Sequence, residues 1–489
     1  MKLKRTLTVT LLILILLFSF SGIALASGGE GGSGDALGNK LPIWSILPFV
    51  GMLLSIAIIP LVNGHWWEHN MAKVSAFWSL VFFLPFFAAY GSNEAIYQFL
   101  HIVILDYIPF IILLFGLFAV SGGIILRGSL RGSPQVNITL LSIGTLLASW
   151  VGTTGASMLL IRPLIRANEW RKKKTHLVIF FIFLVSNIGG CLTPVGDPPL
   201  FLGFLRGVPF FWTMNLIGPM AFNAVILLTI CFFMDRYYYK KESGLDQMAK
   251  AEKEPLRVDG LQNLVYLAMI IGAVIFSGIL SKNAAFADLS SGSLYGITLY
   301  KHGGHDLVLP FVNLIRDSII LLAAFLSIKT TSQSIRQDNR FTWSPIKEVA
   351  TLFIGIFITM IPALQILSAR GAELGLTMPA HFFWATGMLS SFLDNAPTYL
   401  VFMTTAASLH APAGLVTTVG TIAPQMLAAV SCGAVFMGAN SYIGNAPNFM
   451  VRTIAEENKI KMPSFFGYMG WSIAFLIPLF ILNTLIFFR

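Results

Sequence analysis

Apolar segments long enough to cross a lipid bilayer follow one another along almost the whole chain. A spanning helix needs about 20 mostly apolar residues, and such runs recur from residue 42 to residue 488. Of the 489 residues, 56% are hydrophobic and 11% are charged, whereas soluble domains carry about 25% charged residues. A soluble core of this length cannot hide so much apolar surface. The sequence therefore predicts an all-α polytopic membrane protein whose main partner is the lipid bilayer.

The net charge of +10 does not indicate a nucleic-acid partner. The basic residues lie in short loops between the apolar spans, which is the pattern of the positive-inside rule. The sequence has no Gly-x-Ser-x-Gly motif and no phosphate-binding loop, so we expect neither an enzyme nor a user of ATP, and no cofactor. The three cysteines, Cys191, Cys231 and Cys432, lie in apolar stretches, and we expect them to be small buried residues.

The first residues have the layout of a signal peptide. Lys2, Lys4 and Arg5 precede the apolar run 11–20, and Ala24-Leu25-Ala26 provides a small-residue cleavage site. Residues 1–26 are therefore expected to be a cleaved signal peptide, with an uncleaved leader helix as the alternative. In either case the polar segment 27–41 begins outside the membrane.

The remaining spans fall into two halves with the same order of elements. The first half, 42–234, and the second half, 261–489, are joined by a charged segment, 235–260, that we interpret as a cytosolic linker. Each half contains three apolar helices, a split apolar segment, a helix broken by Gly and Pro, and a last unbroken helix. The expected spans of the first half are 42–61, 74–91, 104–126, 137–166, 175–204 and 210–234. Those of the second half are 261–281, 313–329, 347–368, 380–407, 420–455 and 464–488.

The sequences of the two halves also match weakly at their breaks. Residues 193–199 align with residues 441–447, and residues 153–157 align with residues 394–398. The position of basic residues then tests the number of crossings. If each split segment is a re-entrant hairpin, the basic cluster from Arg166 to Lys174 lies on the inner side of the membrane. Most of the other Lys and Arg residues in loops then lie on the same side, as the positive-inside rule expects. That arrangement gives five transmembrane helices plus one re-entrant helical hairpin per half, and it makes the halves two inverted repeats.

The breaks themselves predict the binding site. A backbone polar group in lipid must be satisfied internally, so Gly and Pro clusters at mid-span are tolerated only where protein or a water-filled cavity covers them. Matched broken helices in two halves are typical of a transporter's site. The alternative for any single break is a simple proline kink. Four breaks in a symmetric set, each containing Ser, Thr, Asn or Asp, favour a functional site.

Two acids lie within the breaks, Asp197 in the first broken helix and Asp394 in the second split segment. A charged side chain at the centre of a bilayer costs about 2.5–3.5 kcal/mol on insertion scales. Burial favours the neutral form of a carboxyl group, so an acid in this setting can bind and release protons near neutral pH. The structural alternative is that each acid caps the start of a half-helix.

Two sequence runs resemble the signature of a known superfamily. Residues 186–197, Ser-Asn-Ile-Gly-Gly-Cys-Leu-Thr-Pro-Val-Gly-Asp, and residues 392–398, Phe-Leu-Asp-Asn-Ala-Pro-Thr, resemble the ion transporter superfamily. Its members include NhaD-type sodium/proton antiporters, arsenite transporters, and citrate and dicarboxylate carriers. The resemblance covers nearly all of the chain after its leader. It implies inverted repeats with two re-entrant hairpins, a scaffold domain and a transport domain, elevator-type transport, and often a homodimer. We expect a bacterial-type inner membrane.

The resemblance and the breaks together give a set of candidate ion-binding residues. They are Thr153, Thr154 and Ser157 in the first hairpin, Asn187, Thr193 and Asp197 in the first broken helix, Asp394, Asn395 and Thr398 in the second hairpin, and Asn440, Ser441 and Asn445 in the second broken helix. Proton coupling is expected at Asp197 and Asp394. A sodium ion is expected at Asp197, Asn187, Asn395 and Asn440, because hard cations prefer oxygen ligands. The first hairpin departs from the pattern, since Thr153-Thr154 stands where relatives often carry an acid or an amide.

Two functions fit these residues. The first hypothesis is sodium/proton antiport, with a small inorganic cation alternating with protons at the two acids. The second is sodium- or proton-coupled transport of citrate or a related small carboxylate, in which half-helix N-termini bind the carboxylate. A membrane enzyme or a passive channel is a distant third reading.

Overall fold

The computed structural model describes residues 37–489 except 129, 243–254, 289–292 and 303–304. The expected signal peptide and most of the polar segment 27–41 lie outside the described residues. The described chain is mainly helical, and the prediction of an all-α membrane protein is confirmed. Within the described residues, seven stretches are long and apolar enough to cross a membrane: Ile43–Ser121, Thr175–Leu192, Phe210–Tyr239, Gln262–Leu280, Phe311–Thr330, Ser344–Leu374 and Phe465–Phe487.

The first of these stretches holds several predicted spans in one continuous run of helix. Helix α3 (Leu47–His101) bends at Asn63 and at Gly91, where the backbone angles are not helical. The chain then passes through a π-helical segment, η3 (Ile102–Tyr107), into α4 (Ile108–Ser121). The run is 79 residues long, about 120 Å at the helical rise per residue, so it must fold back on itself to fit a bilayer. The bends separate the predicted spans 42–61, 74–91 and 104–126.

The next elements follow the predicted breaks. Helices α5 (Pro134–Val151) and α6 (Thr153–Ala167) are separated only by Gly152, and α7 (Thr175–Leu184) is followed by the 3-10 turn η4 (Ile188–Leu192) and α8 (Pro198–Leu205). The 3-10 turn η5 (Phe210–Leu216) leads into α9 (Ile217–Tyr239). Gly152 has a φ of +81°, a conformation that glycine adopts without steric cost, so the sequence places its most permissive residue at the tip of the first hairpin.

The second half has the same order. Helices α11 (Gln262–Leu280), α12 (Phe311–Thr330), the short α13 (Gln333–Asp338) and α14 (Ser344–Arg370) precede the split segment. That segment consists of α15 (Pro379–Ser390) and α16 (Asn395–Ala407), and the broken helix consists of α17 (Pro424–Met437), η7 (Gly438–Asn440) and α18 (Ala446–Glu457). The chain ends with α19 (Phe465–Phe487). Every predicted break is confirmed.

Short helical and β segments complete the described chain. Helix α2 (Leu37–Lys40) and the 3-10 turn η2 (Ile43–Ile46) precede α3, and η6 (Gly371–Leu374) follows α14. The described residues also form three antiparallel strand pairs, which the sequence did not predict. They are β1 (Ile125–Arg127) with β2 (Arg257–Asp259), β3 (Gly296–His302) with β4 (His305–Pro310), and β5 (Leu415–Thr417) with β6 (Gly420–Ile422).

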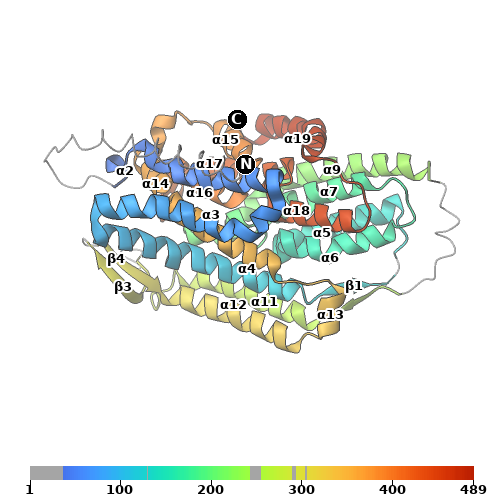
Figure 1. Ribbon diagram of the computed structural model, residues 1–489, viewed down its shortest axis with the longest axis horizontal. Coiled ribbons are helices and arrows are strands. Elements are labelled where there is room, and N and C mark those ends of the chain that lie inside the picture. Colours follow the sequence, from blue (N-terminus) through green and yellow to red (C-terminus); the bar gives the residue numbers. More distant parts are fainter. Residues whose placement is uncertain (1–36, 129, 243–254, 289–292, 303–304) are drawn as a thin grey trace, which may run out of the picture.

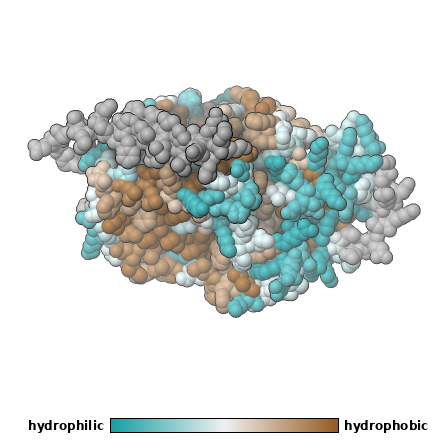
Figure 2. Space-filling model, viewed as in Figure 1, coloured by the Kyte–Doolittle hydropathy of each residue, from teal (hydrophilic) through white to brown (hydrophobic). Residues whose placement is uncertain are grey.

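The helices lie roughly parallel to the long axis of the molecule, with β3–β4 at one end and β1 and α13 at the other (Figure 1). Helices α4, α11 and α12 pack side by side along one flank. The surface over the left half of this view is largely hydrophobic, and hydrophilic side chains gather at the right end (Figure 2). Large apolar side chains of α9, α11, α12 and α19 are exposed. Since water disfavours such a surface, it is the surface that lipid covers.

The core is built around the two broken helices. His176 and every following residue of α7 are buried, and so are residues 429–437 of α17. Their sequences are nearly continuous apolar runs, as is typical of an element surrounded by protein on all sides. The breaks that follow α7 and α17 therefore lie in the middle of the molecule rather than at its surface.

Candidate functional site

The breaks of the two broken helices have the same backbone geometry. Thr193 and Ser441, which follow the two 3-10 turns, are both extended, with φ/ψ of −141°/157° and −139°/170°. Asp197 and Asn445, which precede α8 and α18, are also a matched pair, with −143°/141° and −151°/139°. The alignment of residues 193–199 with residues 441–447 therefore pairs positions that are equivalent in backbone conformation.

One glycine in each break allows the chain to pass close to the 3-10 turn before it. A Cβ atom on Gly196 would lie 2.2 Å from the carbonyl oxygen of Gly190, and one on Gly444 would lie 2.5 Å from that of Gly438. Both distances are far below van der Waals contact, and the obstructing atoms belong to the backbone. Glycine is thus required at the same place in both breaks, so that the chain can pass close to the preceding 3-10 turn.

The carboxylate of Asp197 is the centre of a buried polar cluster. Its Oδ1 accepts hydrogen bonds from Thr153 Oγ1 at 2.9 Å and from Asn445 Nδ2 at 3.1 Å. Its Oδ2 accepts one from Asn395 Nδ2 at 2.6 Å. All four side chains are nearly or completely buried. One residue from each predicted break therefore meets at this acid.

The starts of four helices converge at the same point. Thr153 is the first residue of α6 and Asn395 the first of α16, while Asp197 and Asn445 immediately precede α8 and α18. The N-terminus of a helix carries about half a positive elementary charge. Asp197 is the N-cap residue of α8, but its side chain makes no capping hydrogen bond to that helix. Its carboxylate instead lies among the four positive helix ends, which stabilise a negative charge in the protein interior.

A second layer of amides supports the cluster. Asn445 Nδ2 also donates to Asn187 Oδ1 at 3.3 Å and to the carbonyl oxygen of Ser186 at 3.1 Å. Asn187 Nδ2 donates to Asn448 Oδ1 at 2.7 Å, and Asn448 Nδ2 donates to the carbonyl oxygens of Gly438 and Ser441, both at 2.9 Å. These bonds tie the first broken helix to the second. Asn448 was missed by the sequence reading, although it lies three residues after Asn445 on the same turn of helix.

Two buried oxygen atoms near the second hairpin accept no hydrogen bond from any described residue. They are Oδ1 of Asn395 and Oδ1 of Asn440. Asn440 donates from its Nδ2 to Ser391 Oγ at 2.9 Å, whereas its Oδ1 has no hydrogen-bond donor among the described residues. A buried acceptor without a partner costs about 1–3 kcal/mol. Both residues belong to the predicted sodium set, and a bound cation would satisfy oxygen atoms of this kind.

Asp394 has a different role from Asp197. It precedes α16, and its Oδ1 accepts a hydrogen bond from the Ala396 amide at 3.0 Å. That bond is the helix cap named above as the structural alternative. No hydrogen bond joins Asp394 to Asp197 among the described residues. The acid that meets the other breaks is Asp197 alone.

The other candidates make mostly local contacts. Thr193 Oγ1 donates to the carbonyl oxygen of Ser149, and Thr398 Oγ1 donates to that of Asp394 at 2.9 Å. Ser441 Oγ accepts from the amides of the following turn, and Ser157 Oγ lies 2.9 Å from Ser186 Oγ. These residues shape the breaks rather than contact Asp197. The aligned position opposite Asn395 was Thr154, yet the neighbouring Thr153 makes the bond to Asp197.

A small cavity reaches the cluster from one side. It has a volume of about 90 Å³ and is lined by residues 152–155 and 194–198, by Leu117 and Phe118 of α4, and by Val349 of α14. Thr154 lines this cavity. The cavity therefore lies between α4 and α14 on one side and the breaks that hold Thr153 and Asp197 on the other.

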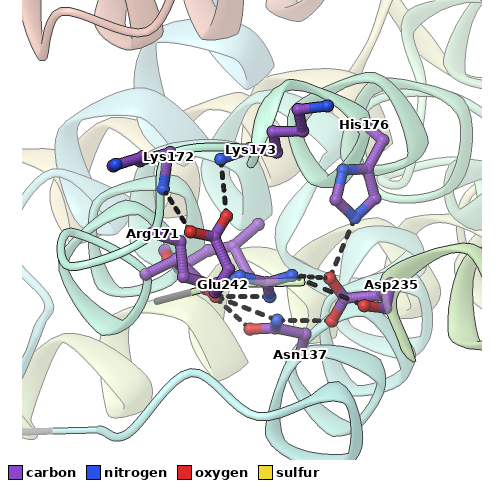
Figure 3. Close-up of polar contacts among 9 residues, drawn as sticks. Asn137, Arg171, Lys172, Lys173, His176, Asp235 and Glu242 are labelled. Carbon is purple, nitrogen blue, oxygen red and sulfur yellow. Dashed lines mark hydrogen bonds and ion pairs between the residues drawn. The ribbon is translucent and has the colours of Figure 1, made fainter. Parts of the chain in front are cut away.

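A second buried polar cluster, which the sequence reading did not foresee, lies near the junction of α6, α7 and α9 (Figure 3). Asp235 Oδ1 accepts from Arg171 Nη2 at 2.5 Å and lies 2.9 Å from His176 Nε2, while its Oδ2 accepts from Asn137 at 2.9 Å. The side chains of Arg171 and Asp235 are fully buried. Glu242 accepts from the backbone amides of Lys172 and Lys173 at 3.1 and 2.8 Å. The cluster anchors the connection between α6 and α7 to the end of α9.

Comparison with known protein families matches residues 38–488 to a family described as "Putative citrate transport". No curated protein matches the chain. The match covers both hairpins and both broken helices, and therefore every residue of the Asp197 cluster.

Proposed function

The chain belongs to this citrate-transport family, and we propose that it is a secondary transporter that couples movement of a small carboxylate of the citrate type to a cation. As a member of a transporter family it is not an enzyme, and its helical, apolar architecture is that of a multi-pass membrane protein. The observation that carries the proposal is the family match over residues 38–488. The Asp197 cluster supports it, because one acid, two amides and one hydroxyl from four separate breaks meet there and offer a place for the coupling cation.

The cluster offers separate places for a cation and an anion. Asp197 and the unpartnered oxygens of Asn395 and Asn440 are suitable ligands for sodium, or for a proton at the carboxylate. The amide groups at the starts of α6 and α16 point their positive ends at the same region, and such ends bind carboxylates. A coupling cation would offset the charge of Asp197 and so allow an anionic substrate to approach. This charge compensation is the physical reason why movement of the carboxylate would be coupled to movement of the cation.

Sodium/proton antiport is the second candidate, and one observation favours it. The side chains that hydrogen-bond Asp197 within the described chain are a hydroxyl and two amides, and such a set binds a cation more readily than a carboxylate. In this interpretation sodium and protons would compete for Asp197, and Asp394 immediately precedes Asn395, which contacts Asp197. No carboxylate would be needed.

Reconstitution in liposomes separates the two candidates. Labelled citrate uptake that requires an inward sodium or proton gradient supports carboxylate transport. Dissipation of an imposed pH gradient by sodium alone, with no carboxylate present, supports antiport. If neither activity is found with protein that is folded and oriented, the proposal fails.

For the membrane arrangement we propose two inverted halves in a bacterial-type inner membrane, with the mature N-terminus outside, re-entrant hairpins α5–α6 and α15–α16, and elevator-type movement, within a homodimer. The matched backbone angles of the two breaks support the symmetry. Single cysteines at Glu169 and Val416, in a background without the native cysteines, test the topology. We expect a membrane-impermeant thiol reagent to label position 416 from outside and position 169 from inside. Labelling of both from one side would contradict the re-entrant hairpin.

A further inference from the structure

A larger polar cavity lies at the far ends of two helices that begin at the Asp197 cluster. It has a volume of about 220 Å³, and its lining includes Gln98, His101, Arg206, Gln365, Ser368 and Thr404. Arg206 follows the last residue of α8, and Thr404 lies near the end of α16. Because α8 has eight residues, the cavity lies about 12 Å from Asp197 along the helix. Ligand sites for drug-sized molecules occupy about 300–1,000 Å³, so this volume suits a small ion.

Arg206 brings a positive charge to this cavity. Its Nη2 donates to Asp106 Oδ2 at 2.7 Å, and its side chain is 12% exposed. Its Nε is buried and has no hydrogen-bond partner among the described residues. A guanidinium group presents its N–H groups as a planar fork that matches a carboxylate. Because Nε is covered by protein, the part of the fork that stays exposed beside Asp106 is the part that can reach a carboxylate in the cavity.

The acid that orients Arg206 comes from an irregular element. Asp106 lies in η3, the π-helical segment between α3 and α4, and its side chain is almost completely buried. π-Helical turns occur frequently at functional sites, because they rotate side chains out of the regular helical register. The plain structural interpretation, that Arg206 merely pairs with Asp106, accounts for Nη2 but not for the part of the guanidinium that stays exposed at the cavity.

Neutral donors complete the lining. Gln98 Nε2 donates to Glu94 Oε1 at 2.9 Å, and Gln98 Oε1 accepts from Gln365 Nε2 at 3.1 Å. This chain of bonds fixes the orientation of the Gln365 amide and leaves its second hydrogen available. The hydroxyl groups of Ser368 and Thr404 belong to the same lining. A carboxylate can accept bonds from groups of each kind.

We propose that this cavity is a binding site for a small carboxylate anion, which waits there before it reaches the Asp197 cluster. The loading role rests on the proposed carboxylate transport, whereas the binding itself does not. The cavity lies between α3, η3 and α14 on one side and α8, α16 and β5–β6 on the other. It is therefore bounded by elements from both halves of the chain, on a different side of the cluster from the cavity at Thr154.

Binding to the purified full-length protein tests the site, with Asp197→Asn as the background that lacks the carboxylate proposed to hold the coupling cation. Because a citrate ion could still occupy the central cluster in this background, the cavity variants assign the binding to this site. The probes are citrate and succinate, measured by titration calorimetry. We expect Asp197→Asn to retain citrate binding. Adding Gln365→Glu places a negative charge in the cavity while leaving the Asp106–Arg206 pair intact, and we expect it to weaken that binding by at least about tenfold. Gln337→Glu, an exposed change on α13, is the matched control and should have no effect.

A second variant keeps the test decisive if Gln365→Glu alters folding. The double change Asp106→Asn with Arg206→Gln removes both charges together and should also abolish citrate binding in the Asp197→Asn background. Unchanged affinity in both variants, or no citrate binding to Asp197→Asn itself, would overturn the site. Equal competition by sulfate would overturn its assignment to carboxylates.

Transport then tests the loading role separately. In an otherwise native protein, Gln365→Glu should raise the KM for citrate and leave kcat unchanged, and an unchanged KM would overturn the waiting position. If the native protein transports no citrate but Asp197→Asn still binds it at this cavity, the proposed function fails and the site stands.

Discussion

The side-chain amide of Asn395 donates a hydrogen bond to the carboxylate of Asp197 at 2.6 Å, although the two residues are 198 positions apart in the chain. Each stands at the start of a short helix, α16 and α8, and each lies in a different half of the molecule. The bond thus joins the second hairpin to the first broken helix at the one acid that all four breaks share. Binding or release of a cation or a proton at Asp197 would therefore directly change a contact of the second hairpin.

Asn395→Ala should weaken cation coupling. The change removes both the donor to Asp197 and the unpartnered oxygen beside it. Hydrogen bonds to charged groups contribute about 1.5–3 kcal/mol, so we expect the sodium concentration for half-maximal citrate uptake to rise by about tenfold or more. Uptake by liposomes at varied sodium concentrations measures it.

Thr405→Val is the matched control for that variant. Thr405 is buried in the same helix, and its Oγ1 donates only to the carbonyl oxygen of Val401, at 2.9 Å, among the described residues. We expect its sodium dependence to equal that of the native protein. Equal sodium dependence in Asn395→Ala and Thr405→Val would mean that the bond to Asp197 has no part in coupling.

Alanine at either close-approach glycine should destabilise the fold. A Cβ at Gly196 or Gly444 would overlap a backbone carbonyl of the preceding 3-10 turn. Forcing extra atoms into a tight site typically costs about 1–3 kcal/mol, and backbone cannot move aside as a side chain can. Gly272→Ala on α11 meets nothing within 4 Å and is the control. Thermal unfolding in detergent should show lower midpoints for Gly196→Ala and Gly444→Ala only; native-like midpoints for both would refute the close packing.

Asp235→Asn should be strongly destabilising because it leaves Arg171 buried without its partner. Removing one member of a buried ion pair costs about 3–5 kcal/mol. In contrast, Glu457→Gln affects an exposed pair with Arg340, 3.4 Å long, and surface pairs contribute about 0–1 kcal/mol. Both changes can be compared by their unfolding midpoints. A midpoint for Asp235→Asn as high as that for Glu457→Gln would show that the buried cluster does not anchor α9.

Hydropathy and the positions of Gly and Pro were sufficient to predict the long apolar helices and their breaks, but not the short helices α2 and α13. The split at Gly152 and the breaks at residues 193–197 and 441–445 are visible because few other residues interrupt a long apolar run. The three antiparallel strand pairs of the described chain were not predictable in this way, since their strands are short and lie in connections between helices. β1 and β2, for example, pair residues 125–127 with residues 257–259, and this pairing depends on how the two halves pack.

The site could be predicted in composition but not in detail. Asp197 and Asp394 look alike in the sequence, and only the geometry distinguishes the acid that contacts the other breaks from the acid that caps its own helix. The sequence predicts that Asp235 belongs to a charged linker, because the apolar run of the preceding span ends near residue 234. Its partners Arg171 and His176 are 64 and 59 residues away, so its burial depends on tertiary packing.

The measurement that tests the central claim most directly is gradient-driven uptake of labelled citrate by liposomes containing either the native protein or Asp197→Asn. We expect the native protein to take up citrate only when a sodium or proton gradient is imposed. Asp197→Asn keeps the size of the side chain but removes its charge, and we expect its uptake to fall to the level of protein-free liposomes. Full gradient-driven uptake by a folded Asp197→Asn protein would contradict the account.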